Sequence, residues 1–134
     1  MAENFYFPHK IARELLENEF FNCERMEIKM KVLVIEPEKD PVVREIDGNL
    51  KSMQAVVGGY IQAYYPWLEE VAIVCNDEGK INGLPLNRPV FGERGELLDI
   101  IAGTFFICGA PMDSGSFTDL SEDLIEHYMR LFQL

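Results

Sequence analysis

Residues 31–46, KVLVIEPEKDPVVREI, are the stretch that decides the fold. They contain two runs of strand length, residues 31–36 and 42–46, both rich in β-branched side chains. A turn rich in proline and charge, residues 37–41, separates the two runs. This pattern predicts a β-hairpin and places the start of the compact body near Met30.

A short amphipathic helix is predicted directly after this hairpin. Residues 47–49 break the second strand and can cap the helix. The glycine pair that follows residue 57 ends the helix, because glycine readily adopts left-handed backbone geometry. The apolar side chains at helical spacing are Leu50, Met53, Val56 and Val57.

Three further apolar segments predict strands, over residues 60–65, 71–75 and 99–108. Gly103 inside the last segment indicates a bulge or a close backbone approach. A C-terminal helix follows, with Ser116 or Thr118 as its predicted N-cap. Its predicted buried stripe is Leu120, Leu124, Tyr128 and Leu131, with Ile125 and Phe132 beside it.

Helical spacing of apolar residues also occurs between residues 11 and 20. We therefore expect an N-terminal helical extension over residues 1–29 and a single α+β domain over residues 30–134. The order of elements favours a small, mostly antiparallel sheet with helices packed on one face, plus the N-terminal helix.

Composition limits the classes of function. The chain has 134 residues, of which 23 are acidic and 12 basic, and a formal charge of −11. Direct binding to nucleic acid is not expected, since that needs clustered Lys and Arg. No apolar run has the roughly 20 residues that span a bilayer, so no membrane partner is expected. The three cysteines are too few and too scattered for a secreted disulfide scaffold, which favours a cytoplasmic protein.

Catalytic chemistry has little support in the sequence. Cys75 and Cys108 lie in apolar runs, where a thiol behaves as a small buried hydrophobic group. The two histidines, His9 and His127, lie near opposite ends of the chain and give no metal-ligand spacing with the cysteines. We predict no enzyme activity, catalytic residue, metal site or cofactor.

The most distinctive segment is residues 76–88, NDEGKINGLPLNR. Asparagine carries both a donor and an acceptor, and arginine presents a planar fork suited to phosphate or carboxylate. A plain hairpin turn, with asparagines satisfying backbone groups, explains the same composition and is the favoured interpretation. The alternative is a ligand site that includes the preceding glycine pair. Its candidate residues are Gly58, Gly59, Tyr60, Asn76, Lys80, Asn82, Asn87 and Arg88.

Four blocks of residues resemble a known family. They are Val57-Gly58-Gly59-Tyr60-Ile61, Asn76-Asp77-Glu78-Gly79-Lys80, Gly83-Leu84-Pro85-Leu86-Asn87-Arg88 and Asp99-Ile100-Ile101-Ala102-Gly103-Thr104. In this order and at these separations, residues 30–132 resemble domain-of-unknown-function family 3846. The resemblance implies a setting on phages, plasmids and other mobile elements of bacteria. It implies no reaction and no catalytic residues.

Two functional hypotheses follow. The preferred one is a small acidic accessory protein of a mobile genetic element that binds a host macromolecule, in an anti-defence role, with a protein of the bacterial host as the expected partner. A negative surface can dock where a nucleic-acid-binding enzyme expects phosphates. The alternative is a protein that binds or sequesters a small anionic, nucleotide-type ligand through residues 76–88. A homodimer, formed through the aromatic N-terminus and residues 60–67, is left open.

Overall fold

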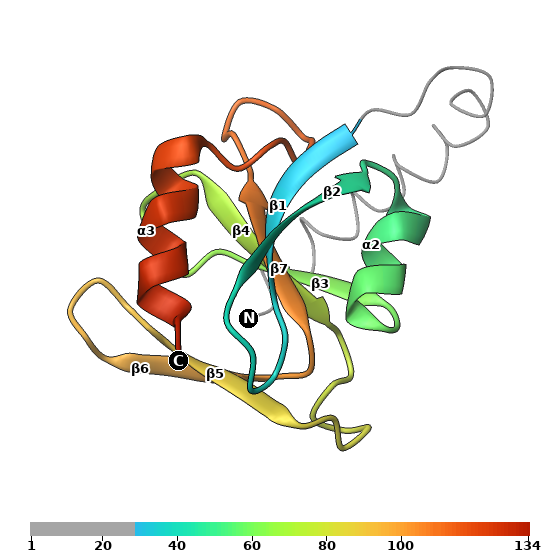
Figure 1. Ribbon diagram of the computed structural model, residues 1–134, viewed down its shortest axis with the longest axis vertical. Helices are drawn as coiled ribbons and strands as arrows, with labels where there is room; N and C mark the ends of the chain where they lie inside the picture. Colours follow the sequence, from blue (N-terminus) through green and yellow to red (C-terminus); the bar gives the residue numbers. More distant parts are fainter. Residues whose placement is uncertain (1–28) are drawn as a thin grey trace.

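The computed structural model describes residues 29–134. The predicted N-terminal helix lies outside these residues. Strands β1 (Lys29–Ile35) and β2 (Val42–Asp47) pair antiparallel, with Lys29 opposite Asp47 and Val34 opposite Val42. The predicted hairpin is therefore confirmed, and it forms one edge of the main sheet (Figure 1).

Five strands form the main sheet, in the order β2-β1-β7-β4-β3. The remaining members are β3 (Ile61–Tyr64), β4 (Val71–Asn76) and β7 (Phe105–Gly109). All of its neighbouring pairs are antiparallel. Every residue of the central strands β4 and β7 is buried. Because both faces of these strands are covered, the sheet is the middle layer of the domain.

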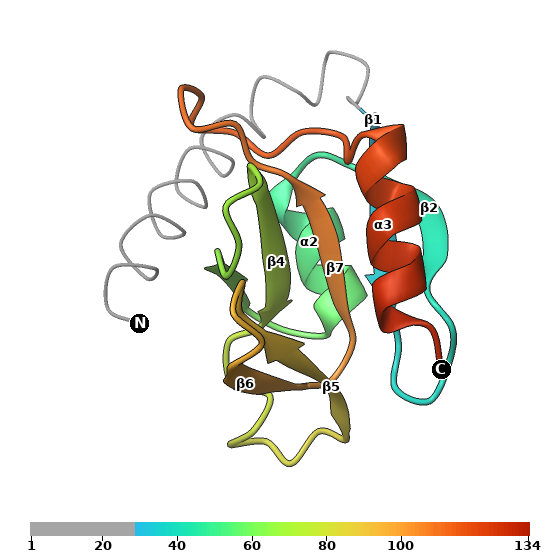
Figure 2. The ribbon, with the colours of Figure 1, turned by 90° about the vertical axis from the view of Figure 1, so that its left-hand side faces the viewer.

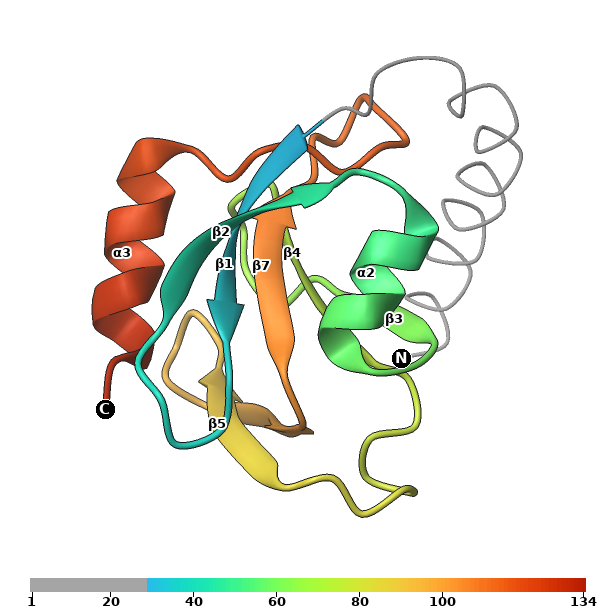
Figure 3. The same cartoon turned by 45° about the vertical axis from the view of Figure 1, so that its right-hand side comes forward.

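The two helices cover opposite faces of this sheet, so the prediction of helices on one face is wrong (Figure 1 and Figure 3). Alternate strand residues point to opposite faces. Leu33 and Ile35 pack in one apolar cluster with α3 (Glu122–Phe132). Val32 and Val34 pack in the other with α2 (Leu50–Val57). The physical reason is that β1 is apolar on both faces, and each face needs its own cover.

Helix α2 has the predicted caps. The side chain of Asn49 accepts a hydrogen bond from the main-chain N–H of Ser52 at 2.8 Å. Gly58 ends the helix with a φ of 82°, in the left-handed region that glycine adopts without strain. Residues 47–59 thus form the local structure that the pattern predicts.

Helix α3 begins later than predicted. Its N-cap is Ser121, whose hydroxyl accepts from the main-chain N–H of Leu124 at 3.4 Å, and neither Ser116 nor Thr118 caps it. The helix residues buried against the sheet are Ile125, Tyr128 and Phe132, while Leu131 is half exposed. Phe132 is buried in place of Leu131, and its ring packs edge-on against that of Phe105, with 5.8 Å between the ring centroids.

A second, two-stranded sheet lies across one end of the molecule (Figure 2). It consists of β5 (Leu86–Phe91) and β6 (Leu97–Ala102). The predicted single strand over residues 99–108 is wrong, since Gly103, with a φ of 86°, separates β6 from β7. Strand β5 overlaps the segment 76–88, for which the composition predicts a turn, because Asn87 and Pro89 are poor strand residues. Pro89 is tolerated because the hairpin is only two strands wide.

The β5–β6 hairpin packs on the same side of the main sheet as α3. Val90 and Ile101 are buried in the apolar cluster that contains Tyr128 and Phe132. Among residues 29–134, no helix is long and apolar enough to cross a membrane. The candidate site residues lie after α2, at the end of β4, in the β4–β5 connection and in β5.

Candidate functional site

Asn76 is the residue that organises the predicted ligand segment. It ends β4 and is 8% exposed. Its Nδ2 donates to the carbonyl oxygen of Val57 at 3.1 Å, and its Oδ1 accepts from the main-chain N–H of Glu78 at 2.8 Å. The side chain thus joins the end of α2 to the start of the β4–β5 connection. Both ends of its amide are used within the chain, as the turn interpretation predicts.

The glycine pair fits closely against Asn76. The main-chain N–H groups of Gly58 and Gly59 donate to the carbonyl oxygen of Gln54, at 2.8 and 3.2 Å. A Cβ atom at Gly59 would lie 2.9 Å from the Nδ2 of Asn76, closer than carbon atoms approach in proteins. A side chain at this position would therefore displace the Asn76 amide from its hydrogen bond to Val57, whether or not a ligand binds there.

Four predicted site residues do come together. Gly59, Tyr60, Asn76 and Asn82 line one depression of about 250 Å³, with Gln54 and Glu78 completing it. The Tyr60 side chain is 70% exposed. The depression is open, and the one carboxylate among its lining residues is that of Glu78. A neighbouring acid disfavours an anionic ligand here.

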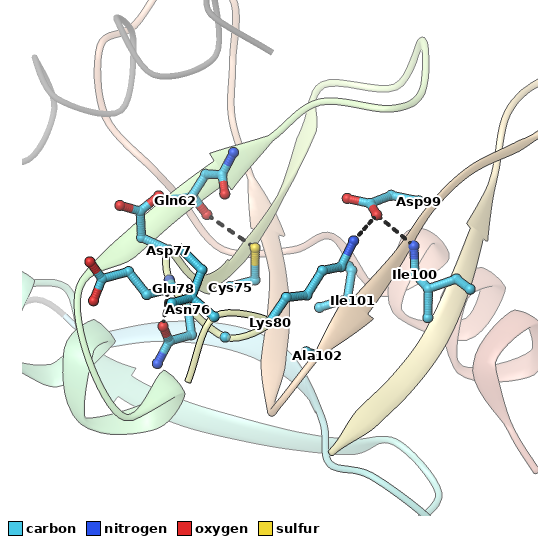
Figure 4. Close-up of a pocket in the computed structure, with 12 residues that line it drawn as sticks. Gln62, Cys75, Asn76, Asp77, Glu78, Lys80, Asp99, Ile100, Ile101 and Ala102 are labelled. Carbon is cyan, nitrogen blue, oxygen red and sulfur yellow. Dashed lines mark hydrogen bonds and ion pairs between the residues drawn. The ribbon is translucent and has the colours of Figure 1, made fainter. Parts of the chain in front are cut away.

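Lys80 faces away from this depression, into a second cavity of about 200 Å³ (Figure 4). Its Nζ lies 2.6 Å from the Oδ1 of Asp99 on β6. We call this cavity the Gln62 cavity. It lies between the β3–β4 strands, the β4–β5 connection and β6, and its lining includes Gln62, Cys75, Lys80, Asp99, Ile101 and Ala102.

Asn87 and Arg88 lie apart from both cavities. Asn87 Nδ2 donates to the carbonyl oxygens of Ile35 and Gly103, each at 2.9 Å. Arg88 is 7% exposed. Its Nε donates to the carbonyl oxygen of Phe132 at 2.9 Å, its Nη2 to that of Lys39 at 2.6 Å, and its Nη1 to the Oδ1 of Asn87 at 2.9 Å. These side chains join the hairpin to β1, to the β1–β2 turn and to α3.

The two cations of the predicted ligand segment are therefore already engaged. Lys80 pairs with a carboxylate, and the Arg88 fork is directed at oxygen atoms of the chain itself. Capture of a phosphate by either cation would require one of these interactions to be exchanged. The geometry thus gives the anionic-ligand hypothesis little support from residues 76–88.

The β5–β6 hairpin presents apolar side chains to solvent. Two cross-strand pairs, Pro89 with Ile100 and Phe91 with Leu97, lie on the strand face opposite to buried Val90. Phe91 is 50% exposed and Leu97 is 55% exposed. A groove of about 480 Å³ between β5 and α3 adjoins this exposed face and shares Pro89 and Phe91 with it. Its lining also includes Trp67, His127 and Leu131.

Cys75 and Cys108 do not have the lowered thiol pKa of a nucleophilic cysteine. Burial raises the pKa of Cys75 to about 12, and the carboxylates of Asp99 and Asp77 act in the same direction. Burial also raises the pKa of Cys108 well above its ordinary value. Reactive cysteines have a lowered pKa, so both residues behave as buried hydrophobic groups. Within the described part of the chain, no cluster of three or more His, Cys, Asp or Glu side chains could hold a metal ion.

Comparison with known proteins places the chain in a family. The sequence model of the family described as Domain of unknown function (DUF3846) matches residues 30–133. The chain belongs to this family. No curated protein and no solved structure matches the chain.

In this DUF3846 domain, the match begins in β1 and ends in the residue after α3, so it covers every element of the described fold. Three polar residues of the Gln62 cavity, namely Gln62, Cys75 and Asp99, are absent from the predicted site. A signal for Gln62 existed, since it is a polar residue within an apolar strand segment. The position of the Gln62 side chain could not be predicted from the sequence, because it depends on the pairing of β3 with β4. That pairing sets Gln62 opposite Cys75, with both side chains on one face of the sheet.

Proposed function

We propose that this protein is a non-enzymatic accessory protein that acts by binding another protein through the outer face of the β5–β6 hairpin. The observation that carries the proposal is the apolar surface formed by Pro89, Phe91, Leu97 and Ile100, all of which are exposed. Exposed apolar patches with polar rims are typical of protein interaction sites. Aromatic side chains such as Phe91 are enriched at such interfaces.

Charge defines the kind of partner. The chain carries a formal charge of −11, and the turn of the same hairpin carries two acidic residues, Glu93 and Glu96, against one basic residue, Arg94. A negative surface around an apolar centre steers a basic partner into place and repels nucleic acid. The partner that fits this chemistry is a protein with a basic surface around an apolar depression.

The proposed setting of this binding is a bacterial host cell. The family resemblance implies a mobile genetic element in a bacterium, and a basic surface is typical of host proteins that bind nucleic acid. We propose that the protein occupies such a surface in the host cytoplasm, in an anti-defence role.

Capture from a bacterial host lysate tests the proposal, with the full chain as bait at low and moderate salt. The captured protein is then purified and its affinity for the full chain is measured by calorimetry. We expect the double substitution Phe91→Ser and Leu97→Ser to weaken binding at least about tenfold, which corresponds to 1.4 kcal/mol.

The matched control is Leu68→Ser with Met112→Ser. These two side chains are also exposed and apolar, at 86% and 84%, but lie outside the hairpin. Equal binding by the hairpin variant and the control variant would contradict the proposal, and so would the absence of any specific partner at both salt concentrations.

A further inference from the structure

The groove between β5 and the C-terminal half of α3 has aromatic walls, and we call it the Trp67 groove (Figure 1). Its volume of about 480 Å³ lies within the range of about 300–1,000 Å³ that is usual for ligand pockets. The rings of Trp67, Phe91 and His127 line it together with Leu131. Phe91 and Leu131 are 50% and 53% exposed, and Trp67 is half-buried. A guest can therefore reach these walls from solvent.

The ring of Trp67 is held in place by the chain itself. Its Nε1–H donates to the main-chain oxygen of Phe91 at 2.9 Å. The ring also stacks on Tyr128, with 4.7 Å between the centroids and 26° between the planes. Because the ring is already fixed, little conformational entropy is lost when a guest packs on it.

One carboxylate, that of Glu93, belongs to the lining of the groove. Its Oε2 accepts from the main-chain N–H of Leu68 at 2.9 Å, which orients the group. Five ion pairs occur among residues 29–134, and Glu93 takes part in none of them. Its Oε1 receives no hydrogen bond from this part of the chain. The carboxylate is therefore available to a cation of a partner.

The guanidinium of Arg88 also belongs to the lining, but it is directed elsewhere. Arg88 is 7% exposed, and its three nitrogen atoms donate to oxygen atoms of the chain. Its charge interacts with the carboxylate of Asp40 in the β1–β2 turn. The charge that the groove offers to a guest is therefore that of Glu93.

We propose that the Trp67 groove binds an arginine side chain of the partner protein, an inference that deepens the proposed function and rests on it. A guanidinium is flat and stacks on aromatic rings such as those of Trp67 and Phe91. It also forms charge-assisted hydrogen bonds with a carboxylate. The aliphatic stem of arginine packs on apolar side chains such as Leu131. Phe91 belongs both to the groove and to the exposed hairpin face, so one partner can contact the two surfaces together.

Other guests match less of the lining. A phosphate or a carboxylate would meet the like charge of Glu93. A leucine or phenylalanine side chain would pack on the walls and leave the carboxylate without a cation. A lysine ammonium would supply the charge, but it has no plane to stack on the rings. These differences define the probes of the experiment.

Titration of the full chain with the synthetic peptide acetyl-Leu-Arg-Leu-amide tests the groove without any host protein. Trp67 is the only tryptophan in the chain, so its fluorescence reports binding directly. The matched probe carries citrulline, which has the shape of arginine and no charge. At pH 8, where an ordinary imidazole is uncharged, we expect saturable binding of the arginine peptide. The citrulline peptide and the corresponding lysine peptide should each bind at least about fivefold more weakly.

Three variants complete the design. Glu93→Gln removes the charge and keeps an oxygen that can accept from Leu68, so binding of the arginine peptide should weaken at least about fivefold. Glu96→Gln makes the same change in the same turn but outside the lining, and it should leave binding unchanged. Leu131→Ser removes an apolar wall and should weaken binding of the arginine and citrulline peptides alike. A far-UV circular dichroism spectrum equal to that of the wild type shows that each variant is folded.

Three results would overturn the proposal. The first is the absence of a saturable fluorescence change with the arginine peptide. The second is an affinity for the citrulline or lysine peptide equal to that for the arginine peptide. The third is equal affinity of Glu93→Gln and Glu96→Gln for the arginine peptide.

The captured host protein separates this inference from the proposed function. Leu97→Ser alters the hairpin face outside the groove, and Glu93→Gln alters the groove outside the exposed apolar face. Weaker binding of the host protein by Leu97→Ser, with no change in Glu93→Gln, would retain the proposed function and overturn the arginine site. Failure to capture any host protein would contradict the proposed function, whereas specific binding of the arginine peptide would still support the arginine site.

Discussion

The Nε–H of Arg88 donates to the main-chain oxygen of Phe132, the last residue of α3, at 2.9 Å. The same guanidinium donates to the carbonyl oxygen of Lys39 in the β1–β2 turn at 2.6 Å. One buried side chain on β5 therefore connects a helix end and a turn that are 44 and 49 positions away. This arrangement explains a basic residue inside an acidic protein without a ligand.

Arg88→Ala should destabilise the fold by about 3 kcal/mol, because three hydrogen bonds from a charged group are lost and buried acceptors remain. Arg88→Lys should recover only part of this, since an ammonium cannot reproduce the fork. Urea unfolding measures both, and the exposed Arg130→Ala is the control, with a change within about 0.5 kcal/mol. A stable Arg88→Ala protein would show that the guanidinium is free for another role.

Tyr128 connects α3 to the β3–β4 connection. Its ring stacks on Trp67 with 4.7 Å between centroids, and its hydroxyl donates to Glu69 Oε1 at 2.9 Å. Tyr128→Phe keeps the stack and loses the hydroxyl, so it should cost about 1 kcal/mol. Tyr128→Ala loses both and should cost about 3–5 kcal/mol.

Trp67 is the only tryptophan in the chain, so its fluorescence reports directly on the stack. The emission spectrum of folded Tyr128→Phe should match that of the wild type, and that of Tyr128→Ala should shift to longer wavelength. Equal stability losses in the two variants would contradict a separate contribution of the ring.

Gly79 approaches β6 closely. A Cβ atom at this position would lie 2.7 Å from the carbonyl oxygen of Ala102, a backbone atom that cannot rotate away. Gly79→Ala should therefore cost about 2 kcal/mol, in the range of other overpacking substitutions. Thermal and urea unfolding measure the loss. Asn82→Ala, in the same connection but with an exposed side chain, should change stability by less than about 0.5 kcal/mol. Equal losses of stability in Gly79→Ala and Asn82→Ala would contradict a specific clash between residue 79 and the Ala102 carbonyl.

Stability should fall at alkaline pH. In the unfolded chain, the Cys75 thiol ionises near its ordinary value of 9.0, whereas burial in the fold raises its pKa to about 12. Burial raises the pKa of Cys108 in the same direction. The folded state therefore holds protons that the unfolded state releases. This stabilisation is complete below pH 9 and is lost as the pH rises from 9 toward 12.

Urea unfolding at several pH values measures the slope, which should be about 1 kcal/mol per pH unit for each thiol. The variant with Cys75→Ala and Cys108→Ala should have a smaller slope above pH 9. An identical slope would assign the alkaline sensitivity to other groups, of which Tyr128 is one whose pKa is also raised by burial.

Local elements of the fold follow from short-range chemistry. Three features depend on side chains within one element or its immediate neighbours. They are the β1–β2 hairpin, the amphipathic α2 helix with its Asn49 cap and Gly58 terminus, and the burial of Cys75 and Cys108. The conformational preference of a residue and the period of apolar side chains act over these distances, so the sequence alone is sufficient to predict them.

Contacts between distant segments were decided by folding of the whole chain. The placement of α2 and α3 on opposite faces depends on which strands become central, and β5 exists only because β6 pairs with it. Likewise, Arg88, a candidate residue of the alternative ligand site, donates to the end of α3, and Gln62 lines a cavity together with residues of β6. Local sequence patterns do not determine these long-range contacts. Many pairings of apolar segments would bury a similar area, and only the packing of all segments together favours one of them.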